Sequence, residues 1–499
     1  MSNLCRVAQA FSACGGAQPL SACGEAQPFR AALRIGALLT LSVVLSGCMV
    51  GPDYRRPKIE SPATFKSQAD STPAPLIAPE WWRLYRDPDL DQLVATATSS
   101  NQSLQQAAAA VDEARALARM AASFLAPTIS ADPTFTRQRT SANRTSNLSG
   151  NVVGTSVTFN DWLVPIDLTY EIDVWGRVRR GLESSRAQAV ASADDEAMVR
   201  LMIQSDVAQF YYTLRLLDAE AEILTRTVAA YQEQVRVLSV QFKTGLISET
   251  VVSQAEAQLN ATLAQQRDIA RARADQEHAL AILCGQPAPS FSIGAKPLRD
   301  VSPPEVPAGL PAMLLARRPD VAAAEQVVVA ANAQIGVAMA AFYPQFSLAS
   351  VAGFESANLR NLFDWRSRVA SIVPGVSLPI FNHGRLKATV DATRARYRQT
   401  VAIYVNQVLV AYGDVEDALT DLRALSDEVG WLRDAVAASL EYLRLAQVQY
   451  RFGLVDYLLV IDAERTLLAN RLLLAQVVNR QMASSIQLIK ALGGGWSPT

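Results

Sequence analysis

Hydrophobic and polar positions change their period along the chain, and each change predicts a type of secondary structure. Apolar and polar residues alternate over 129–136 and 166–171, and again near 346–354 and 369–380, as in half-buried strands. By contrast, residues 182–244 hold no glycine or proline, and a helix of that length extends roughly 95 Å at about 1.5 Å per residue. Because no compact domain buries such a helix, we expect a coiled-coil-like assembly.

One stretch of the chain occurs twice, first as VQFKTGLISETVVSQAEAQL and later as VQYRFGLVDYLLVIDAERTL. Each copy predicts two helices that meet at a hairpin, because Gly245 and Gly453 can adopt the left-handed conformation that ends a helix. We expect the apolar residue that follows, Leu246 or Leu454, to fold back onto the last helical turn.

The two copies belong to a much longer duplication. Ser248 and Asp456 stand at matched positions, and either can N-cap the next helix. The offset of 208 residues between Gly245 and Gly453 also aligns Gly176 with Gly384, without a gap. Such a repeat is far longer than the units of a solenoid, so the chain is a doubled half-protein.

The duplication predicts one architecture made of two halves rather than several domains. The halves span about residues 80–285 and 312–493, and a proline-rich linker, 286–311, joins them. Each half is expected to run helix, strand, strand, long helix, helix. The second long helix carries Gly413 and Gly430, where we expect it to bend or loosen.

Shorter helices precede the strands. One is expected to begin at Glu80, with Leu84 and Leu90 on its apolar side. Asn101 is suited to cap a second, alanine-rich helix, and Pro319 to open the equivalent helix of the second half.

The N-terminus carries the features of a targeting signal. Two arginines precede a short apolar run over 35–45, and Leu-Ser-Gly-Cys48 follows. This order resembles a bacterial lipobox, so residues 1–47 are predicted to be a lipoprotein signal peptide and Cys48 the lipidated first residue of the mature chain, 48–499. Met49 in place of an aspartate favours the outer membrane. The alternative is an ordinary secretory signal with a chance cysteine.

The strands constrain the assembly. A lipid environment tolerates no open sheet edge, so strands in an outer-membrane lipoprotein suggest a β-barrel. Four strands cannot close a barrel, since small barrels need about eight. The barrel must therefore be shared between chains, and either two or three copies are open at this point. A periplasmic sheet would show a similar alternation.

Composition and scattered reactive residues argue against other classes of protein. A net charge of −1 gives no basic surface for nucleic acid. No uninterrupted apolar run reaches the length of a membrane-spanning helix. The two histidines, His278 and His383, lie far apart without ligand-spaced neighbours, and His383 is more consistent with a turn. Cys284 has no partner in the mature chain, so we expect it to pack as a small apolar residue. These features predict neither an enzyme nor a metal or cofactor site.

Several motifs together resemble the outer-membrane factor (TolC-like) family, in particular its lipoprotein branch, which serves resistance-nodulation-division efflux systems. The resemblance covers nearly all of the mature chain. The most specific motifs are Cys48 with GPDY at 51–54, WW at 81–82, LARRPDV at 315–321, AFYP at 341–344 and ALGGG at 491–495.

The resemblance implies a mainly α-helical homotrimer with a small transmembrane β part. Four strands per chain would complete a twelve-stranded β-barrel in the outer membrane, and the long helices would form a periplasmic α-barrel. The expected partners are a periplasmic adaptor protein, an inner-membrane pump and outer-membrane lipid, with no cofactor beyond the lipid on Cys48. The expected function is a passive conduit that exports small molecules or drugs.

The resemblance also implies a pore constriction just beyond the second hairpin turn, at Leu458, Asp462 and Arg465. Their spacing places them on one helical face, where three copies of a leucine and a carboxylate would narrow and charge a pore. From spacing alone, a solvated face with a local Asp462–Arg465 ion pair is the more common arrangement. Thr250 and Gln254 are the first-half counterparts, so the acidic ring would come from the second half.

Two alternative functions remain open from sequence. A lipid-anchored periplasmic coiled-coil tether would need no alternating strands and would conduct no ions. A type I secretion channel would use the same fold to export proteins. The eight methionines are scattered, which gives no sign of a metal-ion cargo, and the exported substrate is not evident from the sequence.

Overall fold

The computed structural model describes residues 49–66, 77–143, 156–297, 302–306 and 317–497. Predicted features within 1–48, including Cys48, lie outside the described residues. The first half comprises η1 (Trp81–Tyr85), α2 (Pro88–Ser100), α3 (Gln102–Ser123), β1 (Thr128–Ser130), β2 (Thr134–Arg139), β3 (Thr158–Ile172), α4 (Arg177–Lys243) and α5 (Glu249–Leu283). The second comprises α7 (Pro319–Ala340), β4 (Gln345–Ser356), β5 (Arg368–Ser377), α8 (Arg385–Arg451) and α9 (Tyr457–Ala491).

The two halves have matching long helices. Helices α4 and α8 each span 67 residues, and α5 and α9 each span 35. Gly176 and Gly384 precede the two long helices with φ of 80° and 82°. Helix α8 continues unbroken through Gly413 and Gly430, so neither glycine interrupts it.

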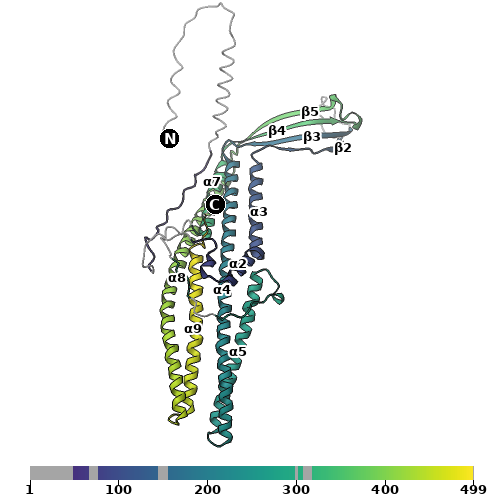
Figure 1. Ribbon diagram of the computed structural model, residues 1–499. Helices are drawn as coiled ribbons and strands as arrows, with labels where there is room; N and C mark the ends of the chain where they lie inside the picture. The colour runs from purple at the N-terminus through teal and green to yellow at the C-terminus, as the bar shows by residue number, and fades with distance from the viewer. Residues whose placement is uncertain (1–48, 67–76, 144–155, 298–301, 307–316, 498–499) are drawn as a thin grey trace, which may run out of the picture. The chain divides into compact units, whose positions relative to one another are not determined.

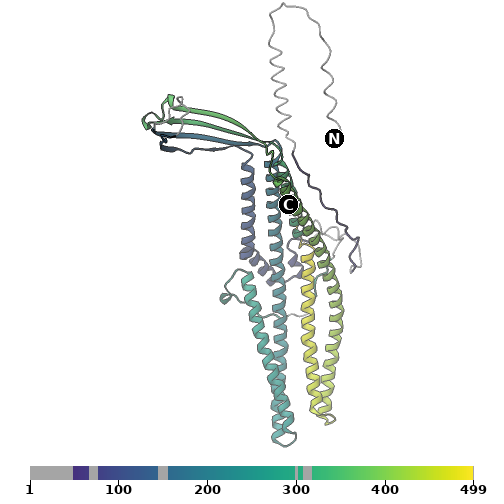
Figure 2. The same ribbon diagram turned by 180° about the vertical axis from the view of Figure 1, so that it is seen from behind.

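The long helices pack as two hairpins, α4 with α5 and α8 with α9, which run away from the sheet in both views (Figures 1 and 2). Helix α4 also contacts α3, α7 and α9, and α7 contacts α8. By length and composition, α7 is the one helix of the described segments that could cross a membrane. Its packing between α4 and α8 gives a sufficient reason for its apolar character.

A hydrophobic core lies where the short helices meet the long ones. Trp81 and Leu90 are fully buried there against α4, together with Tyr211. The helix predicted to begin at Glu80 is in fact two elements, η1 and α2, separated at Arg86, which adopts a left-handed conformation with φ of 52°. Leu84 is 47% exposed, so its predicted place on the apolar side is wrong. Asn101 caps α3 as predicted, accepting a hydrogen bond from the Leu104 amide.

The strands form one antiparallel sheet in which β3 pairs with β4, β4 with β5, and both β1 and β2 with β3. The first predicted strand is therefore interrupted. Ser130 pairs with Asp167, and Thr134 pairs with Leu163. Both pairs are equally far apart on the two strands, so β1 and β2 keep the same register against β3. Two prolines, Pro133 and Pro165, lie in the gap region of the two strands, and neither can donate a ladder hydrogen bond.

The register divides the sheet into two faces, because directly paired residues of antiparallel strands lie on the same side. We call one the apolar face. It carries Ile129, Phe135, Trp162, Val164, Ile166, Leu168, Phe346, Leu348, Phe354, Ile372 and Val376. The opposite face, which we call the polar face, mixes acidic and hydroxyl side chains with a few apolar ones, and includes Asp161, Asp167, Thr169, Glu171, Ser347, Glu355 and Ser371.

Candidate pore constriction and hairpin turns

Both hairpin turns close in the way the repeat predicts. Gly245 and Gly453 have φ of 76° and 67°. The amide of Leu246 donates to the carbonyl of Gln241 at 2.9 Å, and Leu454 bonds its helix in the same way. This pattern is a Schellman motif, which satisfies the free carbonyls at a helix end and requires a left-handed residue. The predicted helix ends are confirmed.

Two details of the predicted turns are wrong. Leu246 and Leu454 are 75% and 73% exposed, so neither folds back onto the last turn. Ser248 and Asp456 do occupy the N-cap positions with extended backbones, but their side chains make no capping hydrogen bond. Because the glycine motif already fixes the entry of the chain, the hairpin closes without a side-chain cap.

Leu458, Asp462 and Arg465 lie along the first turns of α9, and all three side chains are exposed. Asp462 Oδ2 accepts a hydrogen bond from the Tyr442 hydroxyl of α8 at 3.1 Å. Within the described segments no ion pair joins Asp462 to Arg465, so the carboxylate is held across the hairpin and not by its own helix. Sequence reasoning missed Tyr442, which lies on the opposite helix without a recognisable motif.

The equivalent positions of the first hairpin are chemically different. Thr250 and Gln254 occupy the same turns of α5 and are also exposed. Neither carries a charge. At these matched positions, therefore, α9 has a leucine and a carboxylate where α5 has two uncharged polar side chains.

A polar group lies beneath this surface, between the two hairpins. Glu464 of α9 accepts a hydrogen bond from Gln234 Nε2 of α4 at 3.0 Å. The hydroxyl of Tyr457 is buried there without a hydrogen-bond partner in the described residues. Burial raises the pKa of Glu464 to about 7, although the hydrogen bond from Gln234 opposes the shift. Its repeat counterpart, Glu256, is exposed.

The segment that follows Cys48 is bound to the helices by specific contacts. The amide of Val50 donates to the Trp175 carbonyl at 3.0 Å, next to the junction of β3 and α4. Asp53 pairs with the buried Arg180 at 2.7 Å. Further along, the Tyr54 hydroxyl donates to Glu325 of α7 at 2.9 Å. The chain directly after residue 48 is thus held at the level where sheet and helices meet.

The LARRPDV motif has a structural basis that the sequence alone did not reveal. Arg318 is only 4% exposed, and it pairs with Asp320 at 2.6 Å and with Asp414 of α8 at 2.9 Å. It also donates to the Ala491 carbonyl at the end of α9. Arg318 therefore joins the start of α7 to two other helices. Breaking either buried pair would leave an uncompensated charge.

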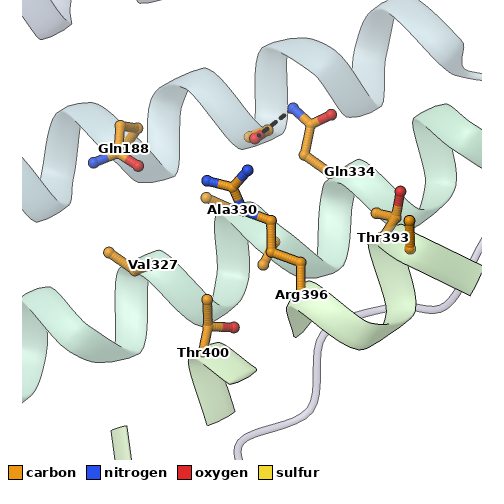
Figure 3. Close-up of a pocket in the computed structure, with 10 residues that line it drawn as sticks. Gln188, Val327, Ala330, Gln334, Thr393, Arg396 and Thr400 are labelled. Atoms are coloured by element: carbon orange, nitrogen blue, oxygen red, sulfur yellow. Dashed lines mark hydrogen bonds between the residues drawn. The ribbon is translucent and has the colours of Figure 1, made fainter. Parts of the chain in front are cut away.

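A polar cavity of about 480 Å³ lies between α4, α7 and α8. Gln334 of α7 points toward α4 there and donates to Ser184 at 2.9 Å (Figure 3). The rest of its lining is mainly small side chains with Gln188, Thr393, Arg396 and Thr400. This lining offers hydrogen-bonding groups, but it pairs no nucleophile with a base.

His383 and Cys284 occupy positions that suit a structural role. His383 adopts φ of 49° in the turn before α8, which confirms its predicted place in a turn. Cys284 is buried at the end of α5, and burial raises the pKa of its thiol to about 11. The described segments contain no group of three or more His, Cys, Asp or Glu residues able to hold a metal ion.

Comparisons with known proteins agree on one family. The pattern of the family described as outer membrane efflux protein matches residues 93–286 and 310–494. The chain is 30% identical over 465 residues to the cation efflux system protein CusC of Escherichia coli, covering 91% of this chain and 97% of the relative. It is 33% identical over 471 residues to the toluene efflux pump outer membrane protein TtgC of Pseudomonas putida, covering 92% and 96%. The solved outer-membrane channel OprN matches with a TM-score of 0.84 at 28% identity, covering 90% and 100%.

Proposed function

Because the chain belongs to the outer membrane efflux protein family, we propose that three copies assemble into the outer-membrane conduit of a tripartite efflux pump. The protein is an outer-membrane efflux channel whose helices extend into the periplasm. Each copy would contribute four strand positions, β1 with β2, β3, β4 and β5, to a shared twelve-stranded barrel. The trimer, the adaptor protein and the inner-membrane pump belong to the proposal.

The main support for this proposal is the difference in polarity between the two faces of the sheet. An apolar face suits lipid and a polar face suits a water-filled lumen. Strands β3, β4 and β5 span 15, 12 and 10 residues, and a tilted strand needs about 9–11 residues to cross a bilayer. Aromatic residues flank the span: Phe135 contacts Trp162 toward the loops, and Trp175 stacks on Tyr343 beside the helices.

Channel function is tested by inserting the purified protein into planar bilayers. A trimeric conduit gives discrete ion conductance, and light scattering gives the mass of three chains. A coiled-coil tether would give no conductance while still being recovered with the membrane fraction. A monomeric protein without conductance would overturn the proposal.

The periplasmic end of the conduit is proposed to close at Leu458, Asp462 and Arg465. The support is their shared exposed face on α9 and the hydrogen bond that holds Asp462 from Tyr442. Three copies of Asp462 near one axis would repel one another, so closure needs cationic partners. Arg465, which forms no ion pair with Asp462 of its own chain, is available to pair with a neighbouring copy.

The N-terminus is proposed to be anchored by lipid on Cys48, after removal of residues 1–47. The support is the position of Val50 at the junction of sheet and helices, where the inner leaflet of the outer membrane would lie. Labelled fatty acid should be incorporated in cells and lost on Cys48→Ser. An outer-membrane protein that still begins at Met1 would contradict this anchoring.

Small molecules or drugs are the proposed cargo. One relative is named for cation efflux and another for toluene efflux, so the family name alone does not select a substrate. If the channel is passive, the inner-membrane pump that it serves determines which molecules are exported. Deleting the gene should therefore sensitise cells to the substrates of whichever pump it serves, and a protein toxin retained in the deletion strain would favour secretion instead.

A further inference from the structure

Charged side chains in the strands are sorted by sign between the two faces of the sheet. All four strand acids, Asp161, Asp167, Glu171 and Glu355, lie on the polar face. All three strand bases lie on the apolar face, where Arg368 pairs with Phe354 and the other two pair with polar residues of β3. They are Arg137, Arg139 and Arg368.

These arginines also share one end of the sheet. Arg137 and Arg139 close β2 and pair with Asn160 and Thr158 near the start of β3. Arg368 opens β5 and pairs with Phe354 near the end of β4. This end leads into the loops and not into the helices (Figure 1). Since the helices extend into the periplasm, the arginines lie toward the outer leaflet.

Aromatic side chains accompany the arginines at this end. Phe135 and Trp162 pack with ring centroids 4.2 Å apart, and Phe354 meets Phe363 at 5.5 Å. The Arg368 guanidinium lies over the ring of Trp365, which is 75% exposed. Aromatic residues prefer the level of the lipid head groups. The arginines therefore sit at the head-group level and not in the hydrocarbon region, where a charge is costly.

Few of their guanidinium donors have a partner among the residues that the structure describes. Arg139 Nε donates to Ser156 Oγ at 3.3 Å, and Arg368 Nε donates to the Trp365 carbonyl at 2.7 Å. No acidic side chain of the described segments forms an ion pair with any of the three. A guanidinium presents up to five donors in a planar fork that matches phosphate oxygens.

We propose that Arg137, Arg139 and Arg368 form a binding surface for the phosphate groups of anionic glycolipid in the outer leaflet. The proposal requires the sheet to span the outer membrane with its apolar face toward lipid. Three copies of the surface would surround the barrel. Phosphate is favoured over a hydrocarbon contact because the three charged side chains are all cationic, are exposed, and lie opposite to the face that holds every strand acid.

Native mass spectrometry of the purified trimer tests this surface, with bisphosphorylated lipid A and the same acylated disaccharide without phosphates as probes. We expect wild type to retain the phosphorylated lipid with roughly tenfold or greater preference, as one or two charge-assisted hydrogen bonds would give. Arg137→Gln, Arg139→Gln and Arg368→Gln together should abolish that preference, while the triple lysine variant should keep most of it.

The matched control removes charge from the other face at the same end, through Asp161→Asn with Glu355→Gln. Its lipid preference should equal that of wild type. Equal retention of both lipids by wild type, or an unchanged preference in the triple glutamine variant, would overturn the proposal. Conductance of the same samples separates the channel hypothesis from the lipid-binding hypothesis. A trimer that conducts but shows no preference for the phosphorylated lipid would contradict only the lipid-binding surface.

Discussion

The two hairpins, α4/α5 and α8/α9, share a backbone and differ in chemistry. Their helices have the same lengths, and both turns end in the same glycine motif. Yet the second hairpin exposes Leu458 and Asp462 where the first has Thr250 and Gln254. The comparison teaches that the repeat preserves what the fold needs, while side chains on its surface are free to acquire a role in one half only.

Removing the proposed constriction should have the largest effect, because it removes the chemical difference between the two hairpins. Leu458→Ala with Asp462→Ala deletes bulk and charge, so conductance of the trimer in planar bilayers should rise severalfold and cation preference should fall. Cells should also admit large antibiotics. The matched variant, Thr250→Ala with Gln254→Ala, should behave as wild type. If both variants match wild type, the solvated-face interpretation of these residues stands.

The half-buried carboxyl of Glu464 should give the next largest effect. Its pKa of about 7 lies above the usual 4.5, so between these values the folded hairpin holds a proton that the unfolded chain has released. Stability therefore falls as the pH rises through this window, and the loss is complete above pH 7. Glu464→Gln should remove this loss, which amounts to about 1.4 kcal/mol for each unit of pKa shift.

Protease resistance of the hairpin, measured from pH 4 to 8, checks this expectation. Glu256→Gln is the control, because Glu256 is exposed at the equivalent position and its replacement should leave the pH profile unchanged. A wild-type profile that is flat over this range would contradict the role given to Glu464.

Valine in place of either turn glycine should destabilise the two hairpins equally, because both turns use the same backbone conformation. Either Gly245→Val or Gly453→Val forces a branched residue into the left-handed region, at about 1–2 kcal/mol locally. No neighbouring atom lies within 4 Å of the added Cβ, so the strain is in the backbone alone. Adaptor binding should weaken while the trimer persists, and drug susceptibility should increase.

Gly430→Ala inside α8 is the control for backbone strain. The added Cβ again meets open space, but the helical conformation suits alanine, so this variant should be more stable by about 0.5–1 kcal/mol. Thermal unfolding compares all three. Normal efflux by Gly453→Val would argue against these turns as docking tips.

The smallest expected effect is that of Tyr442→Phe, which removes the hydrogen bond to Asp462 and leaves the ring. One such bond contributes about 0.5–1.5 kcal/mol, so Asp462 should become less ordered and conductance should fluctuate more. Single-channel recordings measure this. A trace identical to wild type would show that the bond does not position the carboxylate.

Much of the fold was predictable because it depends on local patterns. Alternation located the strands, and glycines such as Gly245 located the turns, since both signals act over a few residues. The interrupted first strand was missed although Pro133 was visible, because its consequence depends on Pro165 of the paired strand. Leu84 was misplaced because a left-handed Arg86 separates η1 from α2.

The candidate site was predictable only in part. The spacing of Leu458 and Asp462 showed their shared face, but the contacts that hold them are long-range. Tyr442 reaches Asp462 from another helix, and Glu464 becomes half-buried only because α4 packs against α9. A pattern along one helix carries no information about which neighbour will cover it.

The equal helix lengths of the two halves also limit how the chain tolerates insertions. One extra residue within α8 would advance its tip by about 1.5 Å and rotate everything beyond by roughly 100°. Tyr442 would then turn away from Asp462. Insertions should therefore survive in the loops beyond β2 and β4 but not in the long helices, unless a compensating deletion restores the register.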